Sequence, residues 1–320
     1  MTAKHPFRQV LTLTVLVAAL GYFVDIFDLL LFGILRQKSL LALGVPLEET
    51  LAKGIVLHNV QVWGLLLGGI AWGILGDKRG RLSVLFGSIA LYSVANIGNA
   101  FIEHLPGLTP YQWYLVWRFL AGLGLAGELG AAITLVSETL PKEVRGYGTA
   151  LVAAVGVSGA VVANIVGKHL SWKASYLVGG CLGLALLILR IGVAESGMFK
   201  KASTTTARRG DFFSLFTNWE RFLRFARSTL IGVPLWFGVG ILIFYAPEFG
   251  QALGYTGPVT AGDAIAWCYS GLVIGDLGSG VLSQWLRSRR KVLLLFITLS
   301  LLCVAFLLFA RGLSPKAFYV

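Results

Sequence analysis

Residues 73–81 read GILGDKRGR, a short charged turn that interrupts a long apolar region. The apolar segment before the charges covers 57–76, and the one after them covers 82–102. A helix needs about 20 mostly apolar residues to cross the hydrocarbon core of a membrane, and both segments reach that length. Basic residues collect in cytoplasmic loops, so the three in this turn indicate the cytoplasmic side. The stretch therefore predicts two membrane-spanning helices joined by a tight cytoplasmic turn.

The same pattern continues through the whole chain of 320 residues, of which 56% are hydrophobic and only 13% charged. The mean hydropathy is +0.78. Soluble domains carry about 25% charged residues, so this composition excludes most water-soluble folds. We predict an all-α membrane protein with about nine transmembrane helices. Their expected ranges are 10–35, 57–76, 82–102, 112–138, 147–167, 174–194, 228–247, 262–285 and 292–310.

The distribution of basic residues sets the expected orientation. Most of the 27 Lys and Arg residues fall in the N-terminal tail or in the loops that follow the even-numbered spans. This asymmetry places the N-terminus in the cytoplasm. The first apolar run, 10–35, is longer than the core of a signal peptide, about 7–15 residues, so we interpret it as a span. Because loop residues explain the net charge of +12, nucleic acid is not an expected partner.

Two of the predicted spans resemble each other. Glycines of the second span recur at one constant offset in the eighth span: Gly64, Gly68 and Gly73 correspond to Gly271, Gly275 and Gly280. Both spans also run into a basic turn. Secondary transporters are commonly built from repeated units with the binding site between them. We therefore expect a six-helix unit over residues 1–194 and a partial unit of three helices over 228–320.

The loop 195–227 separates these two units. Its second part, 212–227, interleaves aromatic residues with Arg221, Arg224 and Arg227. A helix with an apolar face and a basic face lies in the membrane interface, where the basic residues attract anionic lipids. We predict a cytoplasmic linker whose amphipathic helix rests on the bilayer.

The turn at 73–81 also resembles a known signature. The major facilitator superfamily has Gly-x-x-x-Asp-Arg/Lys-x-Gly-Arg between its second and third spans. The stretch from Arg118 to Glu128, RFLAGLGLAGE, resembles the fourth span of the sugar-porter and metabolite:proton symporter branches, and the segment around Asp25 resembles their acidic first helix. The resemblance implies a bundle of twelve spans. A chain that ends after nine is then expected to be truncated at its C-terminus; a nine-span protein that works as it stands is the alternative.

Charged side chains inside the spans are the candidate chemical groups. Each costs roughly 2.5–3.5 kcal/mol on insertion scales, so each indicates a function or a partner. Asp25 and Asp28 lie three residues apart and therefore on one helix face. Arg118 in the fourth span lies at a similar depth. The resemblance implies that Asp25 binds the proton and that Arg118 pairs with it, and we expect Glu128 to join this proton-coupling site.

Proton coupling follows from the environment of such an acid. Burial favours the protonated form of a carboxyl group, whereas a nearby guanidinium favours the ionised form. A movement that separates Asp25 from Arg118 would take up a proton, and their return would release it. A static ion pair that fixes helix packing is the alternative. For Glu128 the alternative is a protonated carboxyl bonded to a backbone carbonyl.

Polar and aromatic residues of several spans are expected to line the substrate cavity: His58, Asn59, Gln61, Asn164, Trp236, Tyr245 and Asp276. Asp276 is expected to face Glu128. For the others, interfacial anchoring or helix packing is the alternative. Gly159, Ala163 and Gly167 recur every four residues, which predicts a smooth face for close packing of the fifth span.

The resemblance also implies a charge network that closes the cytoplasmic side. Its expected members are Gly73, Asp77, Gly80, Arg81, Glu138, Arg145 and Glu195. Opposite charges at helix ends can hold one conformation and release it in another. Ordinary loop charge explains the basic members but not the acids. The motif at Glu195 departs from the family pattern, because Ala194 replaces its proline.

These features predict a secondary active transporter of the bacterial inner membrane, which carries a small polar metabolite, a sugar or an organic acid, together with protons by alternating access. A proton-coupled exporter of amphipathic compounds, or a non-functional fragment without the last three helices, is the alternative. Phosphate-binding loops and metal-ligand spacings are absent from the sequence, so we expect no enzyme, cofactor or metal. Cys181, Cys268 and Cys303 lie in apolar runs, so disulfides are not expected. Substrate, protons and lipid are the expected partners of a monomer.

Overall fold

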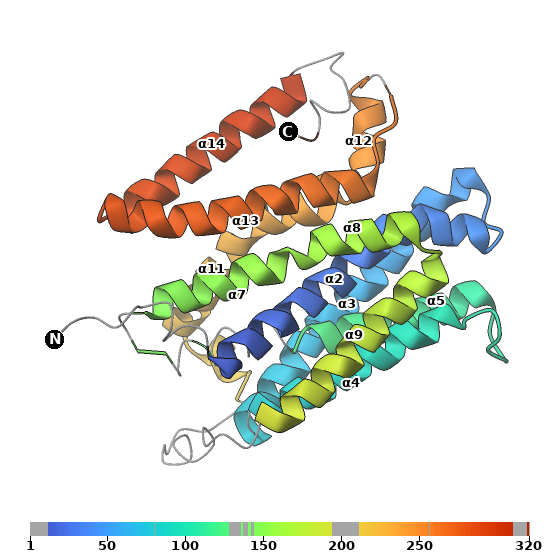
Figure 1. Ribbon diagram of the computed structural model, residues 1–320, viewed down its shortest axis with the longest axis horizontal. Coiled ribbons are helices and arrows are strands. Elements are labelled where there is room, and N and C mark those ends of the chain that lie inside the picture. The colour runs from blue at the N-terminus through green and yellow to red at the C-terminus, as the bar shows by residue number, and fades with distance from the viewer. Residues whose placement is uncertain are drawn as a thin grey trace.

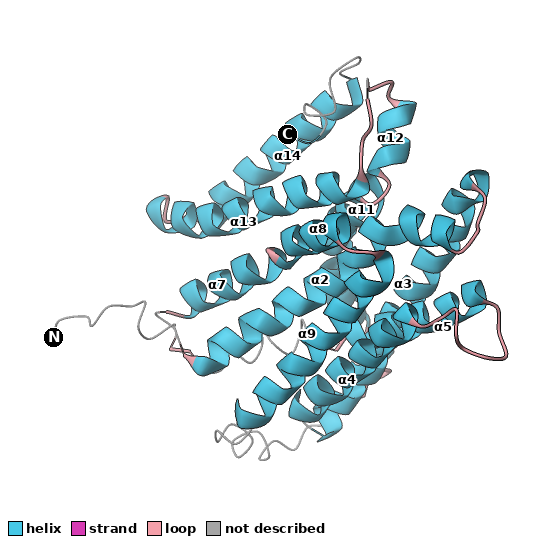
Figure 2. Cartoon of the chain, turned by 45° about the vertical axis from the view of Figure 1, so that its right-hand side comes forward, coloured by secondary structure: helices cyan, strands magenta, loops and turns pink. Residues whose placement is uncertain are grey.

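A computed structural model describes residues 12–79, 81–127, 136, 140, 141, 144–193, 211–255, 257–309 and 319. The regular structure of these residues is helical, and no strand occurs among them (Figure 2). The all-α fold class predicted from the sequence is confirmed.

The first half of the chain contributes helices α2 (Leu13–Ala42), α3 (Leu47–Arg79), α4 (Arg81–Ala100), α5 (Pro110–Leu125), α7 (Arg145–Val157), α8 (Gly159–His169) and α9 (Trp172–Val193). The second half contributes α10 (Ser214–Thr217), α11 (Trp219–Phe237), the π-helix η3 (Gly238–Ile243), α12 (Ala246–Ala252), α13 (Ala261–Trp285) and α14 (Arg289–Phe309). Each predicted span overlaps at least one of these helices. Six helical stretches within the described residues are long and apolar enough to cross a membrane.

Helix α2 runs through the middle of the first half. It packs against α7 and α8 on one side and against α9 and α3 on others, while α5 lies along α3 and α4 packs on α5 and α9 (Figure 1). Phe27, Leu31, Phe32 and Leu35 of α2 are fully buried in the largest apolar cluster. A helix that is apolar on all sides belongs in the interior of a bundle. The two aspartates of α2 are therefore carried into the centre of the molecule.

The second half covers the α2–α8 side of this bundle. Helix α13 packs against α7 and α8, and α14 lies beside α13 at the edge of the molecule (Figure 1). Helix α11 continues into η3, which also contacts α12 and α13. The two halves thus meet where α2, α7 and α8 face α11–α13.

Local hydrogen bonds set the starts of two helices in the first half. The Thr12 side chain caps α2 by accepting the backbone N–H of Val15 at 3.4 Å. Thr109 and Gln112 form a capping box at α5, with Pro110 as the first helical residue. These are the residues that such positions favour, since they satisfy N–H groups that the helix leaves unpaired. The early start of α5 places Arg118 in its third turn.

Glycines let α3 and α5 cross in close contact. A β-carbon added at Gly64 would lie 2.3 Å from the carbonyl oxygen of Phe119, and one added at Gly122 would lie 2.1 Å from that of Gln61. Small residues allow this approach of backbones inside a membrane. The same holds for the predicted smooth face of α8, because a β-carbon at Gly159 would lie 2.2 Å from the carbonyl oxygen of Phe23. That packing prediction is confirmed.

The repeated glycines of α13 have different surroundings. A β-carbon at Gly271 or Gly280 would meet no atom within 4 Å among the described residues, and one at Gly275 would meet only the Phe296 ring, at 3.8 Å. Their counterparts Gly64 and Gly68 are in tight contact with α5. Among the described residues, the glycines of the two spans therefore correspond in sequence but not in packing.

The predicted interfacial helix is not a separate element. Helix α11 begins at Trp219 and continues to Phe237, so the basic, aromatic stretch forms the first turns of the seventh span. Neither glycine nor proline interrupts the sequence between Trp219 and Thr229, which lets the helix propagate. Pro234 lies inside α11, and the π-helical turn follows four residues later. The remainder of the predicted linker, 195–210, lies outside the described residues.

Replacing Gly122 by alanine is expected to destabilise the first half, because the new methyl group would collide with the backbone of α3. Overpacking of this kind typically costs about 1–3 kcal/mol, so the thermal unfolding midpoint of the purified protein should fall measurably. Gly73→Ala is the control, since a β-carbon there meets nothing within 4 Å. Equal midpoints for the two variants would contradict the close helix crossing.

Candidate transport cavity

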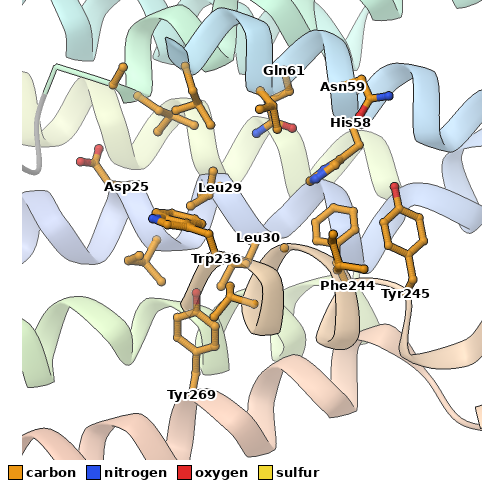
Figure 3. A pocket seen from close by; sticks show the side chains of 18 of the residues that line it. Asp25, Leu29, Leu30, His58, Asn59, Gln61, Trp236, Phe244, Tyr245 and Tyr269 are labelled. Atoms are coloured by element: carbon orange, nitrogen blue, oxygen red, sulfur yellow. The ribbon is translucent and has the colours of Figure 1, made fainter. Parts of the chain in front are cut away.

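A cavity of about 1300 Å³ lies where the two halves meet. Its walls come from α2 and α3 on one side and from α11, η3, α12 and α13 on the other (Figure 3). Most of the lining is aliphatic or aromatic: Leu29 and Leu30 face Trp236, and Phe244 and Tyr269 close the second-half side. An apolar chamber with a few polar groups is the usual form of a small-molecule site.

Asp25 and His58 lie toward opposite ends of the cavity, and Gln61 lies between them (Figure 3). Asp25 and His58 lie on opposite sides of Trp236 in Figure 3. Tyr22 lies near Asp25 and interacts electrostatically with Asp25 and with Asp276 of α13. Carboxyl groups from both halves thus line the cavity within electrostatic range of Tyr22. At the other end the His58 ring stacks on Phe244, with 4.3 Å between ring centroids.

Asp28 lies away from this cavity, inside the first half. Its side chain is 1% exposed and interacts electrostatically with Arg118, which is fully buried. The guanidinium donates a hydrogen bond from Nη2 to Oδ1 of Asn96 at 3.0 Å. Gly179 of α9 makes room for the carboxylate, because a β-carbon there would lie 2.2 Å from Asp28 Oδ1. The structure therefore divides the two aspartates: Asp25 faces the cavity, and Asp28 faces Arg118.

Aromatic rings surround the other faces of Arg118. Its guanidinium carbon lies 5.0 Å from the ring centre of Tyr176 and 5.6 Å from that of Phe32. Such contacts stabilise a cation without neutralising it. The Tyr176 hydroxyl is hydrogen-bonded to that of Tyr114 at 2.7 Å. Sequence reasoning missed Asn96, Tyr114 and Tyr176, although each is a polar side chain in an apolar segment.

Two ion pairs connect the halves at the C-terminal end of α2. Arg36 of α2 pairs with Glu248 of α12, and its guanidinium lies over the Tyr245 ring at 4.7 Å. Lys168 of α8 pairs with Asp263 of α13. None of these four charged residues was predicted, because only charges within spans and at the cytoplasmic helix ends were considered. The sequence feature that could have indicated these pairs is the presence of opposite charges near the ends of spans that become neighbours in the bundle.

Most predicted cavity residues do line the cavity: His58, Asn59, Gln61, Trp236, Tyr245 and Asp276. Asn164 does not belong to this lining; its side-chain amide donates to Asp263 at 3.3 Å and so supports the second ion pair. Glu128 lies outside the described residues, so its predicted partnership with Asp276 stays a prediction.

The predicted cytoplasmic gate is described only in part. Gly73 and Asp77 lie on the exposed last turns of α3. Arg81 and Arg145 begin α4 and α7, but their side chains are not described. Gly80, Glu138 and Glu195 lie outside the described residues. The gate therefore stays a prediction.

A bundle of long apolar helices with buried charges and a cavity between its two halves defines a multi-pass membrane protein. The chain belongs to the Major Facilitator Superfamily, whose family model matches residues 11–320. The predicted family membership is confirmed.

Similar proteins include transporters of several small molecules. The niacin transporter NiaP of Acinetobacter baylyi is 36% identical over 137 residues, which cover 42% of this chain and 30% of that protein. The gentisate transporter of Corynebacterium glutamicum is 25% identical over 303 residues, 86% of this chain and 65% of that protein. The chain thus spans less than two thirds of the length of these relatives.

A solved structure supports the fold. The proton:xylose symporter XylE bound to 6-bromo-6-deoxy-D-glucose superposes with a TM-score of 0.59 at 15% identity, covering 87% of this chain and 69% of that one. At this level of identity the likeness concerns the fold alone.

Replacing Arg118 by alanine is expected to destabilise the protein, because it leaves Asp28 without the nearby cation and Asn96 without its hydrogen bond. Asp28 and Arg118 make no direct ion pair, so we expect a loss of about 1–3 kcal/mol, the cost of leaving a buried polar group unsatisfied. Adding Asp28→Asn to the same protein should recover part of that loss, since an amide tolerates burial without a cation. Unfolding of the purified variants in detergent measures both effects.

The matched control is Arg224→Ala, which removes an exposed pair with Glu220 on α11. Exposed pairs contribute about 0–1 kcal/mol, so this variant should unfold close to the unchanged protein. A loss of stability at Arg118 no larger than that at Arg224 would contradict the buried electrostatic interaction.

Proposed function

We propose that this protein is a proton-coupled symporter of a small polar metabolite that works by alternating access. The observation that carries the proposal is the position of the cavity, which lies between the halves and is lined by a carboxyl group of α2, Asp25, and by one of α13, Asp276. A site between two repeated units is accessible from either side of the membrane when the units rock against each other. A carboxyl group in such a site can change its protonation when its access to water changes.

The electrostatic interaction between buried Asp28 and Arg118 supports proton coupling. Ionised Asp28 is stabilised by Arg118, and protonation of the carboxyl removes that attraction. The gain or loss of this interaction changes how firmly α2 and α5 hold together. Coupling requires that proton binding and substrate binding shift the same conformational equilibrium, and protonation of Asp28 can provide the first of these effects.

The two ion pairs between the halves are suited to act as a gate. Both Arg36–Glu248 and Lys168–Asp263 lie at the end of the bundle that the distribution of basic residues assigns to the periplasmic side. With the N-terminus in the cytoplasm of the bacterial inner membrane, these pairs close the outer side of the cavity. Opening that side requires both pairs to separate, so they favour the inward-facing conformation.

The relatives support a small organic substrate. Those compared above are named as transporters of niacin and of gentisate, and the similar fold is that of a proton:xylose symporter. The cavity of about 1300 Å³ exceeds the usual 300–1,000 Å³ of small-molecule pockets, so it accepts molecules of this size with water.

A second candidate function is proton-coupled export of amphipathic compounds. It is favoured by the apolar wall of Leu29, Leu30, Trp236 and Phe244. Binding of labelled nicotinate and xylose to the purified protein, compared with binding of an amphipathic dye, separates the two functions.

Asp25→Asn is expected to abolish accumulation of substrate against its gradient, because the amide cannot carry a proton. The measurement is uptake of labelled nicotinate, gentisate or xylose into proteoliposomes across an imposed pH gradient. Asp211→Asn is the matched control, since Asp211 is an exposed residue ahead of α10. If the Asp25 variant still accumulates the probe in response to the pH gradient, Asp25 does not carry the proton.

Reversing one charge of the Arg36–Glu248 pair is expected to increase the time that the outer side of the cavity is open, because of the two pairs only Lys168–Asp263 then holds it closed. In a background with every cysteine replaced by serine, His58→Cys reports access through its rate of labelling by a membrane-impermeant maleimide. Arg36→Glu should raise this rate several-fold, because like charges then repel across the gate. Adding Glu248→Arg should restore slow labelling; fast labelling in this exchanged pair would contradict the gate.

A further inference from the structure

The buried position of Asp28 raises the question of how a proton reaches it. Asp28 is 1% exposed and is not among the residues that line the cavity. The cavity presents Asp25 instead, on the same helix. A proton that binds to Asp28 therefore needs a route through the interior of the first half.

A row of hydroxyl groups extends from this region toward the C-terminal end of α2. The hydroxyls of Tyr176 and Tyr114 are 2.7 Å apart, and those of Tyr114 and Ser39 are 3.0 Å apart. All three residues are fully buried. Either oxygen of each pair can be the donor, so the row can point in both directions.

One end of the row lies at the buried charges. Tyr176 interacts electrostatically with both Arg118 and Asp28. Asp28 Oδ1 lies against α9 at Gly179, one helical turn from Tyr176. The groups that surround the carboxyl from the neighbouring helices are thus Arg118 of α5, Asn96 of α4 and Tyr176 of α9, while Asp25 shares its own helix.

The other end lies at the last turn of α2. Ser39 donates its hydroxyl to the Arg36 carbonyl at 3.1 Å, and Gln37 and Lys38 beside it are exposed. Arg36 is also the residue that pairs with Glu248 of the second half. The row therefore leads from the buried aspartate to within one helical turn of the surface.

We propose that Tyr176, Tyr114 and Ser39 form a proton relay that serves Asp28 from the end of the bundle where α2 terminates. When water reaches the end of α2, the Ser39 hydroxyl turns from the Arg36 carbonyl toward Tyr114; the Ser39 oxygen gains a proton from water as its original proton passes to Tyr114. The Tyr114 proton passes to Tyr176, and the Tyr176 proton passes to the Asp28 carboxylate once the two groups move into hydrogen-bonding contact, which they do not make in this conformation. Each hydroxyl ends with one proton, as it began, and the aspartate gains one. Release from Asp28 follows the reverse order.

Packing alone also explains two neighbouring tyrosines, whose rings meet edge to face with 6.2 Å between centroids. Phenylalanine would fill the same space without a buried hydroxyl, which costs free energy unless it is hydrogen-bonded. Replacing tyrosine by phenylalanine therefore separates the two roles. It keeps the ring and removes only the atom that carries a proton.

The relay rests on the proposed function, in which Asp28 is a proton-binding group. The experiment releases protons from a photolysed caged acid onto the purified protein and follows the C=O stretch of protonated carboxyl groups by time-resolved infrared spectroscopy. The band that disappears in Asp28→Asn belongs to Asp28. Tyr114→Phe and Tyr176→Phe are expected to slow the rise of this band by about tenfold or more, with an unchanged final amplitude.

Tyr111→Phe is the matched control, because Tyr111 lies on the same helix as Tyr114 and its hydroxyl donates to the Lys53 carbonyl at 3.1 Å, outside the row. Its rise should equal that of the unchanged protein. Ser39→Ala is a third relay variant that changes the side-chain volume little, and it should slow the rise of the same band.

The outcomes separate the relay from the proposed function. If no band of the unchanged protein disappears in Asp28→Asn, Asp28 does not take up a proton, and both its part in the proposed coupling and the relay that serves it are wrong, whereas the test of Asp25 is unaffected. If the band is present and rises equally fast in Tyr114→Phe, Tyr176→Phe and Ser39→Ala, the relay is wrong. A reduced amplitude at an unchanged rate assigns the hydroxyls a structural role and also overturns it.

Discussion

The burial of one cation, Arg118, constrains much of the first half. A guanidinium inside the hydrocarbon region is costly, so the surrounding helices must supply polar and aromatic partners. The structure provides Asp28 from α2, Asn96 from α4 and Tyr176 from α9. Each neighbouring helix is thereby fixed in rotation, because it must turn one particular side chain toward α5. Asp25 lies three residues before Asp28, and its direction into the cavity follows from the same rotation of α2.

The charged residues at the contact between the halves are arranged differently from those inside the first half. The buried charges of the first half are enclosed by several helices, whereas Arg36–Glu248 and Lys168–Asp263 cross from one half to the other. Glu248 and Asp263 remain partly exposed, at 31% and 27%, so water can take over their solvation when the pairs separate. Partly exposed pairs contribute little to stability and are therefore suited to an interface that must open and close. The interior of the first half can then stay rigid while the boundary changes.

The sequence was sufficient for the fold class, the family and the chemically important interior residues, because charges and glycines in apolar segments are conspicuous. It placed Asp25, Asp28 and Arg118 at one depth and, by resemblance, chose Asp25 as the partner of Arg118, whereas the structure relates Arg118 electrostatically to Asp28. That choice depends on the rotation of α2 and on the space at Gly179, which are properties of packing. The inter-half pairs were missed for a related reason. Lys168 and Asp263 lie 95 residues apart, and only the approach of α8 to α13 relates them. The predicted boundary between linker and seventh span, at residues 227–228, lies inside helix α11. The sequence changes there from basic and aromatic to apolar, but the helix continues from Trp219 to Phe237.

The division between Asp25 and Asp28 has a consequence for coupling. An acid that lines the cavity meets substrate and water together, so its protonation depends directly on what the cavity contains. An acid buried beside a fixed cation responds instead to the arrangement of helices, because its environment contains only protein. Because both acids belong to α2, the cavity contents and the helix arrangement act on the same element, which also carries Arg36 at its end. A single rigid helix therefore links the contents of the cavity, the buried charge and the ion pair that holds the halves together. Coupling in this arrangement needs no change of fold within the first half, only a shift of α2 relative to the second half.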